Sequence, residues 1–147
     1  MTFSISLLSE PVSYPELKEK ACWGLITIGS FQERFIAALD YWDAADYVRH
    51  WKQAIHRIIQ PSPNSCLITS MYDPATANFI YWWPMYRIVD TVVIQNQILF
   101  LDKLPTPFDP NSPFSYVPKH ETVNEDGVQI SEWSLSIEEL KAFYNEG

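Results

Sequence analysis

The side chains that most often carry catalysis or bind metals are few in this sequence, and their spacing favours no reaction. His50 and His56 are six residues apart, so on one helix their rings would point in different directions, and no third ligand is close in sequence. No serine lies in a G-x-S-x-G elbow, and the four glycines form no phosphate-binding loop. We therefore expect no enzyme, no small-molecule substrate, no metal and no cofactor, and we interpret both histidines as surface or half-buried.

The two cysteines, Cys22 and Cys66, lack the C-x-x-C spacing of a zinc or redox site and are too few for a disulfide framework. We expect both to be free and buried. The chain also has no run of about 18 apolar residues and no basic region followed by an apolar stretch at its start. These observations predict a cytoplasmic protein that neither spans a membrane nor carries a secretory signal.

The negative charge is concentrated in the C-terminal part of the chain. The net charge is −8, and residues 90–147 contain ten acidic residues but only Lys103, Lys119 and Lys141 as bases. Binding to nucleic acid normally requires a basic surface that displaces counterions from phosphates, so this composition argues against it. An acidic surface instead suits a basic partner. The alternative is that the surplus acid only keeps a small domain soluble.

Apolar periodicity predicts one α+β domain over residues 1–147. A hairpin is expected from strands at 23–28 and 34–39 around a turn near Gly29 and Ser30. Later strands are expected in "SCLITSMY", "NFIYWWPMYRI", "TVVIQNQILFL" and "VQISEWSL". Residues 1–21 show no clear periodicity, so we predict a loosely attached N-terminal segment with "FSISLL" as a candidate edge strand.

Two helices have clear start signals. The first is predicted at residues 43–59, with Asp43 as its N-cap and Pro61 after its end. Its apolar stripe, expected to pack on a sheet, consists of Val48, Trp51, Ile55, Ile58 and Ile59. Ser136 and Glu139 form a capping box, which predicts a C-terminal helix from residue 137 to about residue 145.

The run "YWWPMY" permits two interpretations. Trp82 and Trp83 must face opposite sides of a strand, so one of them could be exposed and anchor a partner. We favour burial of both, because a helix on each face of the sheet would cover them. Pro84 cannot donate a ladder hydrogen bond and is expected at an edge or a bulge.

Several segments, in this order, resemble a family of immunity proteins from bacterial contact-dependent growth inhibition systems. They are "WGLITIGSF", "LDYWDAADYVRHWKQAI", "SCLITSMYDP", "NFIYWW", "VIQNQILFLD" and "GVQISEW", which span roughly residues 23–144. No one segment is specific by itself, and the order and spacing of all six carry the resemblance.

The resemblance implies a small cytoplasmic immunity protein without catalysis or cofactor. Members bind the C-terminal toxin domain of a large adhesin, usually a nuclease, and neutralise it. The implied fold is a twisted antiparallel β-sandwich with helices, similar to Whirly-type single-strand-binding proteins. Since fold does not carry function, the alternative function, a Whirly-like module that binds a ligand or single-stranded nucleic acid, is separate and conflicts with the charge.

The expected partner is a basic cognate toxin domain in a 1:1 complex, with no membrane or nucleic acid involved. Partner contacts are expected from acids of the C-terminal part and one aromatic anchor, namely Asp102, Asp109, Glu121, Glu125, Asp126, Glu132 and Tyr116. In the stretch before the last helix, Ile130 and Trp133 are expected against the core, while "NED" and Glu132 point outward. A plain solvated turn is the alternative.

Overall fold

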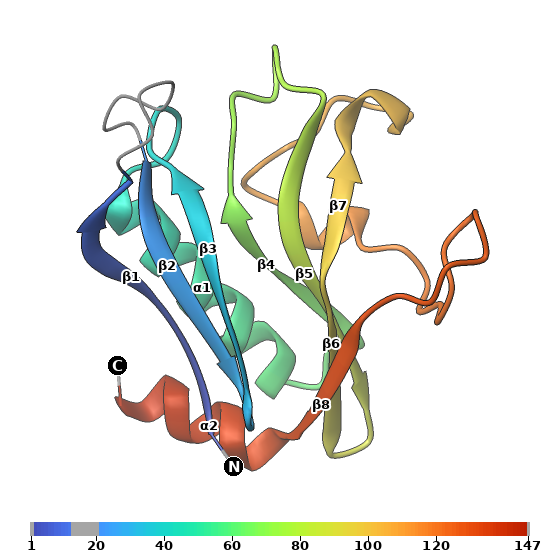
Figure 1. Ribbon diagram of the computed structural model, residues 1–147. Helices are drawn as coiled ribbons and strands as arrows, with labels where there is room; N and C mark the ends of the chain where they lie inside the picture. The colour runs from blue at the N-terminus through green and yellow to red at the C-terminus, as the bar shows by residue number, and fades with distance from the viewer. Residues whose placement is uncertain (1, 13–20, 147) are drawn as a thin grey trace.

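The computed structural model describes residues 2–12 and 21–146 of the chain. Within these residues the protein consists of two antiparallel sheets and two α-helices (Figure 1). The strands are β1 (Phe3–Pro11), β2 (Ala21–Ile28), β3 (Phe31–Ala38), β4 (Asn64–Ser70), β5 (Phe79–Ile88), β6 (Thr91–Gln95), β7 (Gln97–Phe100) and β8 (Glu132–Ser136). The helices are α1 (Ala44–Ile59) and α2 (Ile137–Glu146), and the 3₁₀ turns are η1 (Leu101–Lys103) and η2 (Pro113–Tyr116).

The first sheet has the strand order β1-β2-β3. The predicted hairpin is confirmed as β2 and β3, which turn at Gly29 with a φ of 65° that glycine adopts without steric cost. The candidate edge strand at the N-terminus is also present, as β1. The description of residues 1–21 as loosely attached is wrong for β1, because Phe3 and Ile5 lie in the core. Residues 13–20 lie outside the described residues.

The second sheet has the order β4-β5-β6-β8, with β7 also paired to β5. The single strand predicted over "TVVIQNQILFL" is divided at Asn96 into β6 and β7. Both parts keep one register against β5, with Met85 opposite Ile94 and Trp82 opposite Gln97. Pro84 lies between these pairs, where its missing N–H interrupts the ladder. The last strand is shorter than predicted and begins at residue 132.

Helix α1 has the predicted limits but a different buried face. Asp43 caps it, and the Asp43 and Asp46 side chains accept each other's backbone N–H at 2.8 and 3.0 Å. The buried residues are Tyr47, His50, Trp51, Ala54, Ile55 and Ile58. Val48 is 45% exposed, so its assignment to the apolar stripe was wrong. The buried stripe of the helix runs beside Val48 rather than through it. It includes side chains with polar atoms, which a search for apolar periodicity leaves out.

Polar side chains of α1 bond the backbone along the outer edge of β4. Trp51 Nε1 donates to the Ile68 carbonyl at 2.8 Å, and His50 Nε2 accepts from the Ile68 N–H at 2.8 Å. The Tyr47 hydroxyl accepts from the Met71 N–H at 2.9 Å. The helix thus takes the place of a neighbouring strand. His50 is therefore buried, contrary to our expectation of a surface or half-buried ring, and burial lowers its pKa to about 3.

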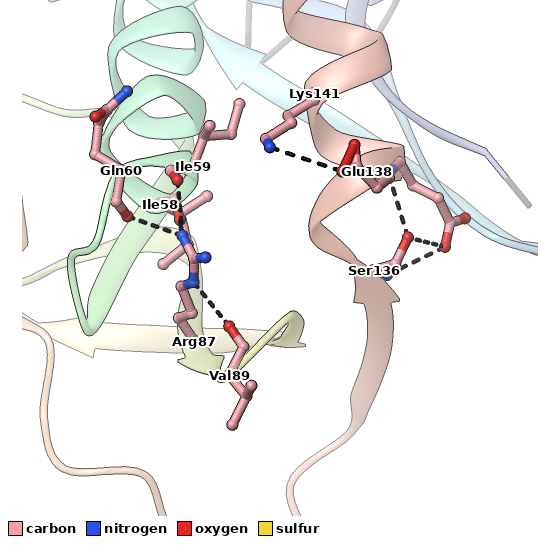
Figure 2. Close-up of polar contacts among 9 residues, drawn as sticks. Ile58, Ile59, Gln60, Arg87, Val89, Ser136, Glu138 and Lys141 are labelled. Atoms are coloured by element: carbon pink, nitrogen blue, oxygen red, sulfur yellow. Dashed lines mark hydrogen bonds and ion pairs between the residues drawn. The ribbon is translucent and has the colours of Figure 1, made fainter.

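The C-terminal end of α1 is held by an arginine from the second sheet (Figure 2). Arg87 Nη1 donates to the carbonyls of Ile58, Ile59 and Gln60 at 3.0, 2.7 and 3.0 Å, and Arg87 Nε donates to the Val89 carbonyl at 2.9 Å. These carbonyls have no partner within the helix, and a cation favours the negative end of its dipole. Arg87 therefore fixes the helix to β5.

Helix α2 begins with the predicted capping box. The Ser136 N–H donates to Glu139 Oε1 at 3.1 Å, and the Glu139 N–H donates to Ser136 Oγ at 3.3 Å. The adjacent pair of Lys141 and Glu138 is longer, at 3.7 Å, and exposed (Figure 2). The Phe143 ring packs edge-on against Phe3 of β1 at 5.2 Å. None of the described helices is long and apolar enough to cross a membrane.

The core contains both tryptophans of the "YWWPMY" run. Trp82 and Trp83 are 1% and 2% exposed, which confirms burial of both. Cys22 and Cys66 are both free, but only Cys66 is fully buried, while Cys22 is half-buried. Burial raises the pKa of each thiol. The predicted mixed fold with antiparallel sheets and two helices is confirmed for the described residues, and the Whirly-type comparison stays a prediction.

Candidate docking surface

Three aromatic rings fill the space between the two sheets at one end. The Trp133 ring from β8 stacks on Phe31 of β3 with a centroid distance of 4.0 Å, and it lies 5.7 Å from Trp83 of β5. Phe31 and Trp83 are 6.5 Å apart. We call these three rings the aromatic plug. Trp133 thus packs against both sheets, which agrees with the core-facing position expected for it.

Beside the aromatic plug, a cleft of about 960 Å³ lies between β3 of the first sheet and part of the second sheet. Its one wall is formed by β3 residues 33–36. Its opposite wall is formed by β5 and β7, and the segment before β8 contributes Asn124, Glu125, Gln129 and Ile130. Cleft-sized spaces of this order can hold several large side chains. We call this space the inter-sheet cleft.

Large apolar side chains are exposed on the wall formed by β5 and β7. Tyr81 is 40% exposed, Ile98 44% and Phe100 45%. Tyr81 pairs directly with Ile98, and Phe79 with Phe100, so the register places these side chains on one face of the sheet. Contiguous exposed apolar side chains often mark a surface that binds a partner. The face is therefore a candidate docking surface.

Charged and amide groups surround this apolar wall. Glu33 from β3 accepts a hydrogen bond from Asn96 Nδ2 at 3.2 Å, which links the first sheet to the second. The Arg34 guanidinium lies 4.8 Å from the centroid of the Trp23 ring. Gln97 Nε2 donates to Gln95 Oε1 at 2.6 Å beside the cleft. The rim is thus polar and its amides are already ordered.

The predicted acidic turn forms part of the cleft. Glu125 lines it, and Asp126 follows at the exposed tip. The turn is shaped by Asn124, whose Oδ1 accepts from the N–H groups of Asp126 and Val128 at 2.9 and 3.0 Å. Gly127 has a φ of 78°, which favours glycine. Neither carboxylate takes part in these hydrogen bonds of the turn. The backbone that carries both side chains is held by Asn124.

Glu121 and Glu132, also predicted for partner contacts, are joined through Gln95. Gln95 Nε2 donates to the Glu121 carbonyl at 2.7 Å and to Glu132 Oε1 at 2.9 Å, and His120 Nε2 lies 3.1 Å from the same Glu132 oxygen. The Gln95 hydrogen bond, against partial burial and with help from His120, holds the pKa of Glu132 below its usual value. Glu121 is exposed, whereas the Glu132 side chain is only 32% exposed and is bound to Gln95 and His120.

Glu121, Asp126 and Glu132 do not line the cleft, and neither do the other three predicted residues. Asp102 lies in η1, and Asp109 lies in the proline-rich loop after it. The Tyr116 hydroxyl accepts from the Asp109 N–H at 2.9 Å and donates to the Pro107 carbonyl at 3.0 Å, while its ring packs 4.7 Å from Phe108. Tyr116 therefore closes this loop, and its role as an aromatic anchor stays a prediction.

The sequence reasoning missed the apolar wall. It concentrated on Trp82 and Trp83, whereas the exposed ring of this strand is Tyr81, with the half-buried Phe79 two positions before it. The alternation was visible in the sequence. The pairing that brings Ile98 and Phe100 beside them depends on the break at residue 96, which no local signal indicated.

A second, smaller pocket of about 240 Å³ lies between α1 and the proline-rich loop. Its lining includes Trp42, Arg49 and Phe114. Among the described residues, no group of three or more His, Cys, Asp or Glu side chains is arranged to hold a metal ion. The larger inter-sheet cleft is the stronger candidate because only it carries the contiguous exposed apolar side chains.

Comparisons with known proteins match nearly the whole chain. A family model described as the CdiI N-terminal domain matches residues 37–143. The chain is 31% identical over 144 residues to the immunity protein CdiI of Enterobacter cloacae subsp. cloacae, with 97% of each sequence covered. It is also similar to a chain of the solved CdiA-CT/CdiI toxin and immunity complex from Enterobacter cloacae. That match has a TM-score of 0.86 and 29% identity, and it covers 99% of this chain and 97% of the other.

Proposed function

The chain belongs to the CdiI immunity protein family, and on that premise we propose that it binds and neutralises the toxin domain of its own cognate CdiA protein. The observation that carries the proposal is the extent of the match to a chain of a toxin and immunity complex, with a TM-score of 0.86 over almost the full length. An inhibitor must present one folded surface to its target. The 31% identity to an immunity protein over 97% of the chain, together with the match in structure, supports such a role.

The proposed mechanism is stoichiometric occlusion without catalysis. One immunity protein would bind one toxin domain in the cytoplasm and keep it from its substrate. We further propose that the toxin is a nuclease. Nucleases attract phosphates and so tend to have basic active-site clefts, and a chain with a net charge of −8 offers a complementary potential.

Acids in the C-terminal part are proposed to guide the encounter. Glu125 and Asp126 are exposed at the tip of an ordered turn beside the inter-sheet cleft, where their charges reach solvent. Rim charges of this kind act chiefly on the rate of association. Asp102, Asp109, Tyr116, Glu121 and Glu132 stay proposed contacts of the same partner.

The function can be tested by expressing the cognate CdiA-CT domain with and without this chain. We expect the toxin alone to stop growth and the chain to restore it, and the two purified proteins to elute together at a 1:1 mass ratio. A CdiA-CT domain from a different toxin class serves as the control and should not be neutralised. Failure of the chain to bind or protect against the cognate domain would overturn the proposal. Degradation of RNA or DNA by the free toxin tests the nuclease assignment separately.

A further inference from the structure

Resting on the proposed function, we propose that the toxin docks in the inter-sheet cleft, and that the cleft receives a cationic toxin segment which carries a large apolar side chain. The occupant is thus part of the cognate toxin domain, and the apolar wall of β5 and β7 is the centre of the interface. Glu33 and Glu125 form its acidic rim.

The apolar wall supplies the first reason. Tyr81, Ile98 and Phe100 are each exposed by 40% or more and lie side by side through the pairing of β5 with β7. Other exposed apolar residues, such as Val48 on α1 and Ile88 at the end of β5, belong to different parts of the molecule. Interfaces take most of their binding energy from a few clustered apolar or aromatic groups. The cleft contains such a cluster, formed by Tyr81, Ile98 and Phe100.

The order of the cleft supplies the second reason. Its end is closed by the aromatic plug, and its walls are linked by the 3.2 Å hydrogen bond from Asn96 to Glu33. The backbone of the acidic turn is set by the Asn124 side chain. A binding site that is already formed loses little conformational entropy when a partner enters. The cleft can therefore accept a side chain without rearrangement of either sheet.

Charge determines the nature of the occupant. Glu33 and Glu125 line the cleft, and Asp126 is next to it in sequence. Arg34 also lines the cleft, with its guanidinium over the Trp23 ring, and Lys103 lies 5.1 Å from the centroid of the Phe100 ring, so these two cations offset part of the acidic charge. With a chain charge of −8, the field around the cleft favours a cationic segment. A phosphate backbone would be repelled by the same field.

The test compares two double variants for binding to the cognate CdiA-CT domain by calorimetry. Tyr81→Ser with Ile98→Ser removes the centre of the apolar wall, and we expect the Kd to rise at least ~100-fold, as for loss of clustered hot-spot residues. Val48→Ser with Ile88→Ser removes two equally exposed apolar residues elsewhere, and the Kd should stay within about threefold of wild type. Wild-type affinity of the cleft variant would overturn the docking site and leave the proposed function standing. Lack of binding by the wild-type chain would instead overturn the proposed function.

A second measurement needs no substitution and so does not depend on folding of the variant. Amide hydrogen exchange of the wild-type chain, free and with bound toxin, should show protection in residues 33–36, 97–100 and 124–130. Protection confined to α1 or to the pocket beside the proline-rich loop would overturn the proposal that the toxin docks in the cleft. So would protection of the same residues by a single-stranded oligonucleotide in the absence of toxin, because the occupant of the cleft would then be nucleic acid.

Discussion

Strands β4 and β7 belong to the same sheet, but their outer edges differ in what they contact. Along β4, Ile68 exchanges both of its backbone groups with α1 side chains, and Met71 donates to Tyr47. Strand β7 pairs with β5 and has no second strand partner among the described residues. We call the edge of the sheet at β4, which α1 covers, the closed side. We call the part of the sheet around β7, with its exposed side chains, the open side.

This difference separates the side chains that stabilise the fold from those that are proposed to bind the toxin. The side chains that close β4 are buried and hydrogen-bonded, so their loss should lower the free energy of unfolding. The rings on the open side, such as Tyr81 and Phe100, are already exposed to water in the free chain. Their removal should leave the fold intact and affect only binding. The two regions can therefore be tested with the same kinds of substitution.

The largest effect is expected on the closed side from Trp51→Ala. Trp51 is 2% exposed and donates to Ile68, so its removal empties a core site and leaves a buried carbonyl without its donor. We expect the free energy of unfolding to fall by about 3–5 kcal/mol, measured by urea denaturation. Val48→Ala on the exposed face of the same helix is the control and should change it by less than about 0.5 kcal/mol. A loss below about 1 kcal/mol for Trp51→Ala would contradict our interpretation that α1 side chains stabilise the fold by covering the edge of β4.

A smaller loss is expected at the boundary between the two regions, from Trp133→Ala. Trp133 is half-buried and stacks on Phe31, so we expect the free energy of unfolding to fall by about 2 kcal/mol. Trp133→Phe keeps an aromatic ring in the plug and should recover more than half of this loss. If both variants were as stable as wild type, the plug would not join the sheets, and the boundary between core and cleft would be misplaced.

The third effect is a pH dependence on the closed side. Burial lowers the pKa of His50 to about 3, whereas an unfolded histidine titrates near 6.5. Between these values the unfolded chain binds a proton that the folded chain does not, so stability is complete above about pH 6.5 and is lost as the pH falls toward 3. From pH 6.5 to pH 5 the expected loss from this residue is roughly 1.5 kcal/mol.

The variant His50→Gln isolates this contribution, because a glutamine amide does not titrate and its oxygen can still accept from the Ile68 N–H. The difference between the two stability curves over pH 5–6.5 cancels the other histidines, His56 and His120. Equal slopes for the two proteins would show that His50 is not buried as an uncharged ring.

The closed side could be predicted further from the sequence than the open side. Capping at Asp43 and Ser136 depends on residues three apart, so both helices were located to within a residue or two. The family resemblance was also correct, since it depends on the order of several segments along the whole chain. The buried role of His50 was missed, because a polar ring is buried only when a distant strand provides its partner.

The cleft was beyond prediction for a different physical reason. Its walls come from β3, β5 and β7, and the rings of the aromatic plug beside it come from β3, β5 and β8, which are far apart in sequence. Of the seven predicted contact residues, only Glu125 lines the cleft. The charge composition predicted the sign of the partner's charge, but it contains no information about which acidic residues lie close together in the fold.

The smallest effect on the fold is expected at the rim of the open side, from Glu125→Lys with Asp126→Lys. The turn is held by Asn124 and by Gly127, so reversal of the two exposed side chains should change the free energy of unfolding by no more than about 0.5 kcal/mol. Association with the cognate toxin should slow markedly, and more at low salt than at high salt, since screening weakens the interaction of exposed charges.

The control for this prediction is Asp90→Lys with Glu138→Lys, which changes the net charge by the same amount at the turn before β6 and on α2. If the toxin responds only to total charge, both double variants should slow association equally, and the acids at the rim would serve solubility alone. If the rim guides the toxin into the cleft, only the Glu125 and Asp126 reversal should reduce the slope of the association rate against salt. Stopped-flow measurements at two salt concentrations separate these outcomes, because the local potential beside the docking surface controls the rate of encounter whereas distant charge is screened within about 10 Å.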